Sequence, residues 1–478
     1  MRVAASWVVA SMLLTQVVTL GRSVITARLL TPDDFGLFGM VTTVVTALGA
    51  LTIVSLDQAI LPGHLDAKDE DVRRRLDVTW TAELVRGLGA ALLLAAAAYP
   101  TSRFYGRAEL TPLLYVASLV LLTRGLQNVG LATLRNRIEF RRLFWHELGA
   151  AITSAVVAVA LALALGNVWA LVAGQLAGVL SGVALSYFLH PYRPRLAYDP
   201  EVFRQVFHYG KYVTLIGVAS YVTTTADNVV IGRLRGAEVL GAYAVAYGLA
   251  SVPAVLVMGA VGRAALPAYA GLAAAESRRL GSAFDRSLAA SVAALTLVTA
   301  PMFLLGPEII SVLFGRKWAA AGAVFGLLSL VGLTRAVSVI ISTLLLGMNK
   351  PREVAAGKVI EAVVFLSLVY PLTSRFGVAG AAYAGLISYL LALLNRLLFI
   401  RRLMPSAFAG ASRIIFASAV AGAVAAAAGW LVLNFVAGDW ARLLAGGAVA
   451  TLTGALLLYG LVPGLASEVR GAVRALRH

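Results

Sequence analysis

The chain has 478 residues, of which 60% are hydrophobic and 13% charged, and its formal net charge is +17. Soluble domains carry about 25% charged residues, so this composition excludes an ordinary soluble protein and predicts a polytopic membrane protein. The absence of cysteine excludes disulfides, thiolate metal sites and iron–sulfur clusters.

Apolar runs of about 20 residues, the length that crosses a bilayer as a helix, recur along the whole chain. The first run resembles a signal peptide, but its helix continues to Thr26 with Arg22 inside it, which indicates an uncleaved span. We predict an all-α protein with about fourteen transmembrane helices, at residues 3–26, 35–60, 76–99, 111–134, 143–165, 168–189, 210–232, 241–262, 287–306, 322–347, 355–374, 377–398, 414–436 and 441–462.

The turn after the first span returns 205 residues later. Residues 27–39 read ARLLTPDDFGLFG and residues 232–244 read GRLRGAEVLGAYA, which aligns Gly36 with Gly241. Proline ends the first helix, an aspartate can cap the next one, and glycine allows membrane helices to approach closely. The repetition predicts two six-helix halves that each begin with the same helix–turn–helix.

The repeat also defines the expected domains. Asp199, Pro200 and Glu201 form the pattern of a helix start between the halves. We predict an N-terminal six-helix bundle at residues 1–190, a cytoplasmic linker with an amphipathic helix at 191–209, a second six-helix bundle at 210–400, and an extra two-helix hairpin with a basic cytoplasmic tail at 401–478.

The basic residues are unevenly distributed between the two sides of the predicted membrane. One set of connections carries most of the 40 Lys and Arg residues, including Lys358 and Arg396, which lie near predicted helix ends. The basic side of a membrane protein faces the cytoplasm, so both termini are expected there. The net charge therefore indicates topology and contact with anionic lipid rather than nucleic acid.

The remaining basic residues fall inside predicted spans: Arg22, Arg86, Arg124 and Arg335. A charge within a span needs a partner or a water-filled cavity. Arg86 follows Glu83 by three residues, so these two are expected to neutralise each other. Arg124 and Arg335 occupy equivalent positions at an offset of 211 residues, and Arg22 corresponds to Asp227 at an offset of 205, where the two side chains could pair.

Polar stripes accompany these arginines, and we expect them to line a hydrated cavity between the halves. Guanidinium groups suit phosphate and pyrophosphate oxygens, so the cavity favours an anionic head group, whereas cationic drugs would favour carboxylates. The substrate-binding candidates are Arg22, Arg124, Arg335, Gln127 and Asn128. The buried carboxylates Asp227 and Glu361 are candidates for a coupling ion. Hydroxyl groups are expected to bond to backbone carbonyls.

Three stretches carry a resemblance to a known family: TARLLTPDDFGLFGM, TTTADNVVIGRLRGAEVLGAYAVAYGLASVP, and GMNKPRE followed by RFGVAGAAYAG. The chain resembles the Wzx-type oligosaccharide and lipopolysaccharide flippases of the multidrug/oligosaccharidyl-lipid/polysaccharide exporter superfamily. The resemblance implies a V-shaped, MATE-like pair of bundles that translocates a polyprenyl-diphosphate-linked oligosaccharide, an exopolysaccharide or O-antigen repeat unit, across the bacterial inner membrane by alternating access. Implied partners are this lipid-linked substrate, membrane lipid, and polysaccharide polymerase and chain-length machinery, with no nucleic acid.

The related lipid II flippases imply a cation site with a carboxylate on the seventh helix, where this chain has Asp227. The eleventh helix offers Glu361 but no nearby asparagine, which puts a sodium site of that kind in doubt. No cofactor is expected, and either Na⁺ or H⁺ is left open as coupling ion.

Other chemistry is disfavoured by the sequence. There is no P-loop for ATP hydrolysis, and the five histidines lack the spacing of metal ligands. The outside loops are short, which argues against a polysaccharide polymerase or ligase, so neither catalytic nor metal-binding residues are expected. A small-molecule, multidrug-type cation-coupled antiporter and a lipid II flippase remain the alternatives.

Overall fold

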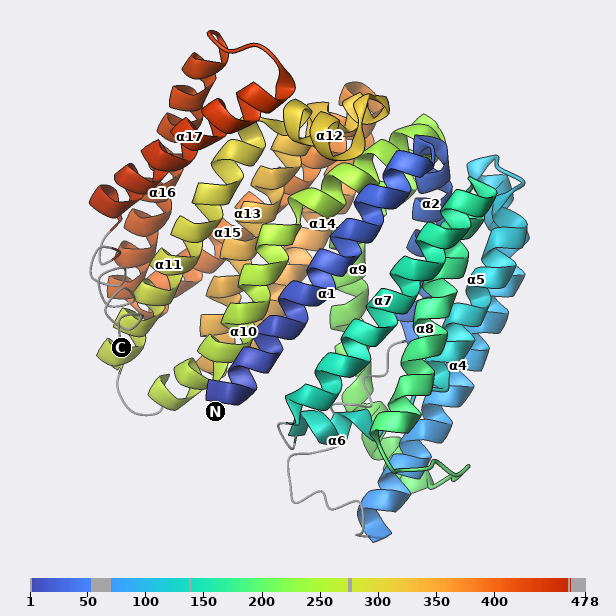
Figure 1. Cartoon of the computed structure of the whole chain (residues 1–478). Coiled ribbons are helices and arrows are strands. Elements are labelled where there is room, and N and C mark those ends of the chain that lie inside the picture. Colours follow the sequence, from blue (N-terminus) through green and yellow to red (C-terminus); the bar gives the residue numbers. More distant parts are fainter. Residues whose placement is uncertain (1, 53–69, 137–138, 274–276, 463–464, 466–478) are drawn as a thin grey trace. The chain divides into compact units, whose positions relative to one another are not determined.

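The computed structural model describes residues 2–52, 70–136, 139–273, 277–462 and 465, and all regular structure in these ranges is helical (Figure 1). The α-helices are α1 (Arg2–Leu29), α2 (Pro32–Thr52), α4 (Glu70–Tyr105), α5 (Leu110–Gly125), α6 (Leu131–Asn136), α7 (Phe140–Leu165), α8 (Trp169–Leu189), α9 (Pro200–Ala250), α10 (Val252–Ala273), α11 (Ser277–Leu304), α12 (Gly306–Phe314), α13 (Ala319–Gly347), α14 (Pro351–Phe376), α15 (Val378–Leu403), α16 (Pro405–Leu433) and α17 (Asp439–Leu461). A short 3₁₀ helix, η1, covers Arg316–Trp318.

Eleven of the described helices are long and apolar enough to cross a membrane, which confirms a polytopic all-α membrane protein. The predicted fourth span is the clearest departure: its helix ends at Gly125 and resumes only as the short α6. The helices of the structure also differ from the predicted seventh and eighth spans. Helix α9 contains a sharp break at Gly236, whose φ of 84° is available to glycine without strain, and α10 begins at Val252.

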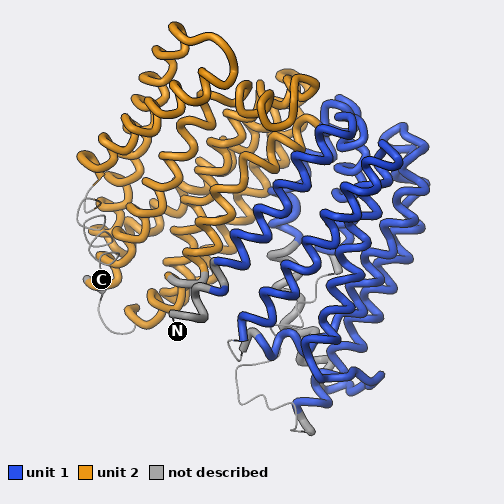
Figure 2. The backbone as a smooth tube through the Cα atoms, in the orientation of Figure 1, with its two compact units in different colours: residues 1–241 blue, residues 242–478 orange. Residues whose placement is uncertain are grey.

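The chain forms two compact units, unit 1 at residues 1–241 and unit 2 at residues 242–478 (Figure 2). In unit 1, α8 packs along α7, α7 packs against α1, and α5 packs along α4. The α4–α5 contact is close, because a Cβ atom added to Gly87 would lie 2.9 Å from the Cα of Gly125. Most of α9, which the sequence analysis assigned to the second half, belongs to unit 1.

Unit 2 is built around α13, which packs against α10, α11, α12 and α15. Phe284 of α11 and Ile340 and Leu344 of α13 are completely buried in its core. The C-terminal hairpin of α16 and α17 packs on α11. Small residues permit this contact, since a Cβ atom on Gly422 of α16 would lie 2.9 Å from the Thr296 side chain.

The first copy of the repeated turn is fixed by reciprocal hydrogen bonds. The backbone N–H of Thr31 donates to Asp34 Oδ2 over 3.0 Å, and the N–H of Asp34 donates to Thr31 Oγ1 over 3.2 Å. This arrangement satisfies free amides at the start of α2. Asp33 instead accepts two hydrogen bonds from Arg107, of 2.8 and 2.7 Å, which raise the pKa of that guanidinium. Of the two aspartates, Asp34 therefore takes part in capping the start of α2, and Asp33 forms an ion pair with Arg107.

The two copies of the turn pack directly against each other through their glycines. A Cβ atom on Gly36 would lie 1.7 Å from the carbonyl oxygen of Ala237, and one on Gly241 would lie 1.9 Å from that of Pro32. These distances leave no room for any side chain at either position. The repeated glycine therefore serves a contact that each copy of the turn makes with the other.

We expect Gly36→Ala to lower thermal stability and membrane abundance, because its methyl group would overlap the Ala237 backbone and separate the turns. Thermal unfolding of the purified protein measures this. Gly49→Ala is the matched control, since a Cβ atom there meets nothing within 4 Å. Equal unfolding temperatures for the two variants would contradict the packing described for the turns.

Residues 190–199 connect α8 to α9 and are anchored to α4. The Tyr192 hydroxyl donates to Asp77, and the backbone N–H of Arg195 donates to the same carboxylate over 3.0 Å. Burial and the hydrogen bond to Asp77 raise the pKa of Tyr192, so it remains a donor at neutral pH. Asp199 Oδ1 accepts the N–H of Glu201 over 2.9 Å at the start of α9. This start matches the expected one, but the helix continues into the following span instead of forming a separate amphipathic helix.

Candidate functional site

A pocket of about 290 Å³ lies within unit 1, between the end of α5 and the helices α7 and α8. Its lining residues are Arg124, Gln127, His146, Ala150, Ser154, Gln175, Gly178, Val179, Gly182 and Val183. The set contains a guanidinium, two amides, an imidazole and a hydroxyl group, and it contains no carboxylate. This volume is slightly below the roughly 300–1,000 Å³ of pockets for drug-sized ligands, so it suits a head group rather than a whole oligosaccharide.

The glycines of α8 determine where the pocket opens. A Cβ atom on Gly174 would lie 2.6 Å from the Ala158 side chain of α7, and one on Gly178 would lie 2.7 Å from that of Ser154. At Gly182 the nearest atom is 3.5 Å away. The two helices are therefore in very close contact at Gly174 and Gly178 and leave more space at Gly182.

Arg124 supplies the charge of the pocket. It lies in the last turn of α5, its side chain is exposed, and it has no hydrogen-bond or ion-pair partner among the described residues. Arg86 on the neighbouring α4 is neutralised, because its Nε donates to Glu83 Oε2 over 2.8 Å, as the sequence analysis predicted. The positive charge of Arg124 is thus left for a ligand or for water.

Arg22 reaches the same pocket indirectly. Its Nη1 donates to Ser154 Oγ over 2.9 Å, and its buried Nε has no hydrogen-bond partner among the described residues. Arg22 could have paired with Asp227, but α1 packs on α7 and presents Arg22 to Ser154 instead. Asp227 is buried in α9, where its Oδ1 accepts the backbone N–H of Asn228 over 2.9 Å.

His146 is a pocket residue that the sequence analysis did not identify. Its Nε2 lies 3.0 Å from the carbonyl oxygen of Gly182, which can only accept, so Nε2 carries the proton. The amide nitrogen of Gln127 lies 3.5 Å from His146 Nε2, which is too far for a good hydrogen bond. The Gln127 amide therefore remains available to a ligand. Gln175 Oε1 is buried and has no hydrogen-bond partner in the described part of the chain.

Asn128 occupies a structural position outside the pocket. Its Nδ2 donates to the carbonyl oxygen of Tyr192 over 2.9 Å, and its Oδ1 accepts the N–H of Gly130 over the same distance. These bonds hold the chain in the non-helical segment between α5 and α6. The polar stripe expected along one continuous helix is therefore interrupted after Arg124, and Asn128 turns toward the 190–199 segment.

Most hydroxyl groups of the polar stripes bond to backbone carbonyls of their own helix, as expected. Thr19 Oγ1 donates to the carbonyl oxygen of Thr15 over 2.8 Å, and Thr224 Oγ1 donates to that of Ser220 over 2.7 Å. Such bonds satisfy the hydroxyl within the helix. These residues therefore add little to ligand recognition.

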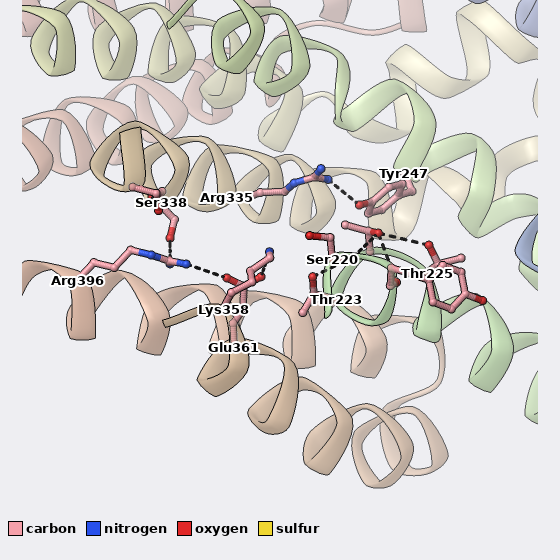
Figure 3. A network of polar contacts seen from close by, with 12 residues as sticks. Ser220, Thr223, Thr225, Tyr247, Arg335, Ser338, Lys358, Glu361 and Arg396 are labelled. Atoms are coloured by element: carbon pink, nitrogen blue, oxygen red, sulfur yellow. Dashed lines mark hydrogen bonds and ion pairs between the residues drawn. The ribbon is translucent and has the colours of Figure 1, made fainter. Parts of the chain in front are cut away.

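In unit 2, Arg335 of α13 is half-buried and donates from Nη1 to the Tyr247 hydroxyl over 3.1 Å (Figure 3). One turn later, Ser338 accepts a hydrogen bond from Arg396 of α15. The other end of that guanidinium pairs with Glu361 of α14, with 3.4 Å between Nη2 and Oε2. Arg335 thus lies on α13, which also carries Ser338. Ser338, Arg396, Glu361 and Lys358 form a buried polar network.

Two members of this network were counted with the connections of the basic side in the sequence analysis. These two residues, Lys358 and Arg396, lie within helices and bind Glu361. Arg396 is only 4% exposed.

The comparisons with known proteins agree with this fold. Residues 25–323 match the family described as polysaccharide biosynthesis protein. The chain is 28% identical to the succinoglycan biosynthesis transport protein ExoT of Rhizobium meliloti (strain 1021), over 64% of this chain and 61% of ExoT. It is 26% identical to the lipopolysaccharide biosynthesis protein WzxC of Escherichia coli (strain K12), over 67% of this chain and 64% of WzxC. The matches thus span less than two thirds of either relative.

Among solved structures, the lipid II flippase MurJ in an inward closed conformation has the same fold, with a TM-score of 0.75. The alignment covers 94% of this chain and 98% of MurJ at 13% sequence identity, which supports the fold and not the substrate. The family match covers more than half of the chain. By that match, the chain belongs to the polysaccharide biosynthesis protein family.

Proposed function

We propose that this protein translocates a polyprenyl-diphosphate-linked oligosaccharide across the bacterial inner membrane by alternating access, with both termini in the cytoplasm. Family membership and the named activity of the relatives support a transporter of glycan precursors. The observation that carries the proposal is the guanidinium of Arg124, which has no partner among the described residues and lines a pocket without carboxylates. The protein is proposed to act as a flippase and not as an enzyme.

A charged group inside a membrane helix is costly unless a partner or water compensates it. Arg124 has no protein partner among the described residues, so an anionic ligand would supply the missing charge. Charge-assisted hydrogen bonds to phosphate are about twice as strong as neutral ones, and guanidinium binds phosphate in a bidentate manner. A diphosphate head group satisfies both conditions, whereas a cationic drug would meet a positive pocket.

Arg22 and Arg335 are proposed as further contacts to the diphosphate during crossing. Each currently donates to a neutral hydroxyl group, of Ser154 and Tyr247 respectively. Bonds from guanidinium to phosphate are stronger than bonds to a hydroxyl, so a diphosphate can displace these internal partners. Gln127 and His146 would contribute neutral polar contacts in the same pocket, and the lipid chain would remain in the bilayer.

The driving force is a separate part of the proposal. Buried Asp227 is the candidate for Na⁺ or H⁺ coupling, since an intramembrane carboxylate is a natural carrier of a cation or proton. A polysaccharide polymerase and chain-length machinery are proposed as partners that use the translocated unit. They would act on the outer face of the membrane after transport.

Proteoliposomes that contain the purified protein test this function. We expect translocation of a fluorescent polyprenyl-diphosphate oligosaccharide and no accumulation of a cationic dye such as ethidium. Dye transport without lipid translocation would identify a multidrug-type antiporter instead. Movement of lipid II alone, with no movement of other lipid-linked oligosaccharides, would identify a lipid II flippase.

A further inference from the structure

The repeat that relates Arg124 to Arg335 continues through the next two helices. Helices α7 and α14 begin 211 residues apart, and each ends at a glycine with a φ of 62°, Gly166 and Gly377. The same offset therefore applies to the helices that follow, α8 and α15. The helix pair that lines the pocket of unit 1 has its repeat counterpart in α14 and α15 of unit 2.

The counterparts of small pocket residues are large and buried. At an offset of 211 residues, Ala150 corresponds to Glu361 and Gly178 corresponds to Tyr389. Glu361 is 1% exposed and Tyr389 is 4% exposed. The two positions that carry small side chains beside the pocket of unit 1 thus carry a carboxylate and an aromatic ring in unit 2.

These two groups form a cage around an ammonium group that belongs to the chain. Lys358 Nζ binds Glu361 Oε1 (Figure 3). The same ammonium group lies 5.8 Å from the centre of the Tyr389 ring. A carboxylate and an aromatic face are the partners that bind ammonium ions in proteins. The second carboxylate oxygen is held by Arg396, so both oxygens of Glu361 are in use.

We infer that the Lys358 ammonium is a resident cation that closes this site to external monovalent cations. The Lys358 side chain is 25% exposed, against 2% for Glu361 and 4% for Arg396, so Lys358 covers the carboxylate on its accessible side. The three groups carry two positive charges and one negative charge, and a further cation would have to displace the lysine. This inference does not depend on which molecule is transported.

The test is thermal unfolding of the purified full-length protein in Na⁺ or in choline at constant ionic strength. In the parent protein, we expect Na⁺ to cause no specific shift of the unfolding temperature that requires Glu361. Lys358→Met vacates the cage and should produce a saturable rise of about 1–3 °C with Na⁺, which Lys358→Met/Glu361→Gln should lack. Lys350→Met, at the start of the same helix, is the matched control and should show no gain.

Two results would overturn the inference. One is a Na⁺-specific shift of the parent protein that survives Asp227→Asn and disappears in Glu361→Gln, since the carboxylate would then bind external cations. The other is a folded Lys358→Met protein with no response to Na⁺, because the vacated cage would not be a cation site. If Lys358→Met does not accumulate, the Na⁺-specific shifts of the parent protein, Asp227→Asn and Glu361→Gln still show whether Glu361 binds external cations.

Discussion

Arg124→Ala is expected to reduce translocation of the lipid-linked oligosaccharide about 30-fold or more, at normal membrane abundance. Removing one partner of a buried, hydrogen-bonded charge pair weakens binding by about 2–5 kcal/mol. Stability should be spared because Arg124 has no protein partner among the described residues, so its removal leaves no carboxylate unpaired. Arg124→Lys keeps the charge but loses the bidentate contact and should retain partial activity.

Translocation in proteoliposomes, normalised to the amount of protein, measures the effect of Arg124→Ala. Arg141→Ala is the matched control, since Arg141 is an exposed arginine near the start of α7 and lies outside the pocket. It should translocate normally. Full translocation by Arg124→Ala at normal abundance would show that the guanidinium does not hold the substrate.

Glu361→Ala should have the largest effect on stability, with a loss of about 3–5 kcal/mol of unfolding free energy. The substitution leaves Lys358 and Arg396 without their shared carboxylate, and Arg396 is almost completely buried. Membrane abundance and thermal unfolding measure the effect. Glu361→Ala/Lys358→Met should recover part of the loss, because one uncompensated cation is removed.

Glu353→Ala provides the control on the same helix. Glu353 lies in the first turn of α14, where its carboxylate contributes about 0.3–1 kcal/mol through the helix dipole. Its variant should unfold close to the parent protein. A Glu361→Ala protein that unfolds at the same temperature as Glu353→Ala would contradict the counter-ion role of Glu361.

The general fold could be predicted because long apolar runs and a repeated turn leave strong signals. The turn at Gly36 and its copy at Gly241 both fall where the sequence places them, and α13, α14, α15 and α17 lie within five residues of their expected bounds. Hydropathy fixes the apolar centre of a helix but not its polar ends. For that reason α14 begins four residues before its predicted span and α15 ends five residues after its own.

The site was predictable only in part. An arginine within a span signals a function or an ion pair, which is why Arg22, Arg124 and Arg335 were predicted as candidates. The end of α5 was missed because Asn128 bonds to Tyr192, 64 residues away, and no local pattern records that contact. His146 was missed for a similar reason, since its neighbours in the pocket come from α5 and α8.

Photo-crosslinking from the pocket tests the central claim most directly. A photoreactive amino acid at Val183, which lines the pocket, should crosslink to a radiolabelled polyprenyl-diphosphate oligosaccharide, and the unlabelled substrate should compete. The same amino acid at Val156, an exposed position on α7, should give only background labelling. Equal labelling at both positions, or labelling at Val183 that the substrate does not displace, would contradict the account.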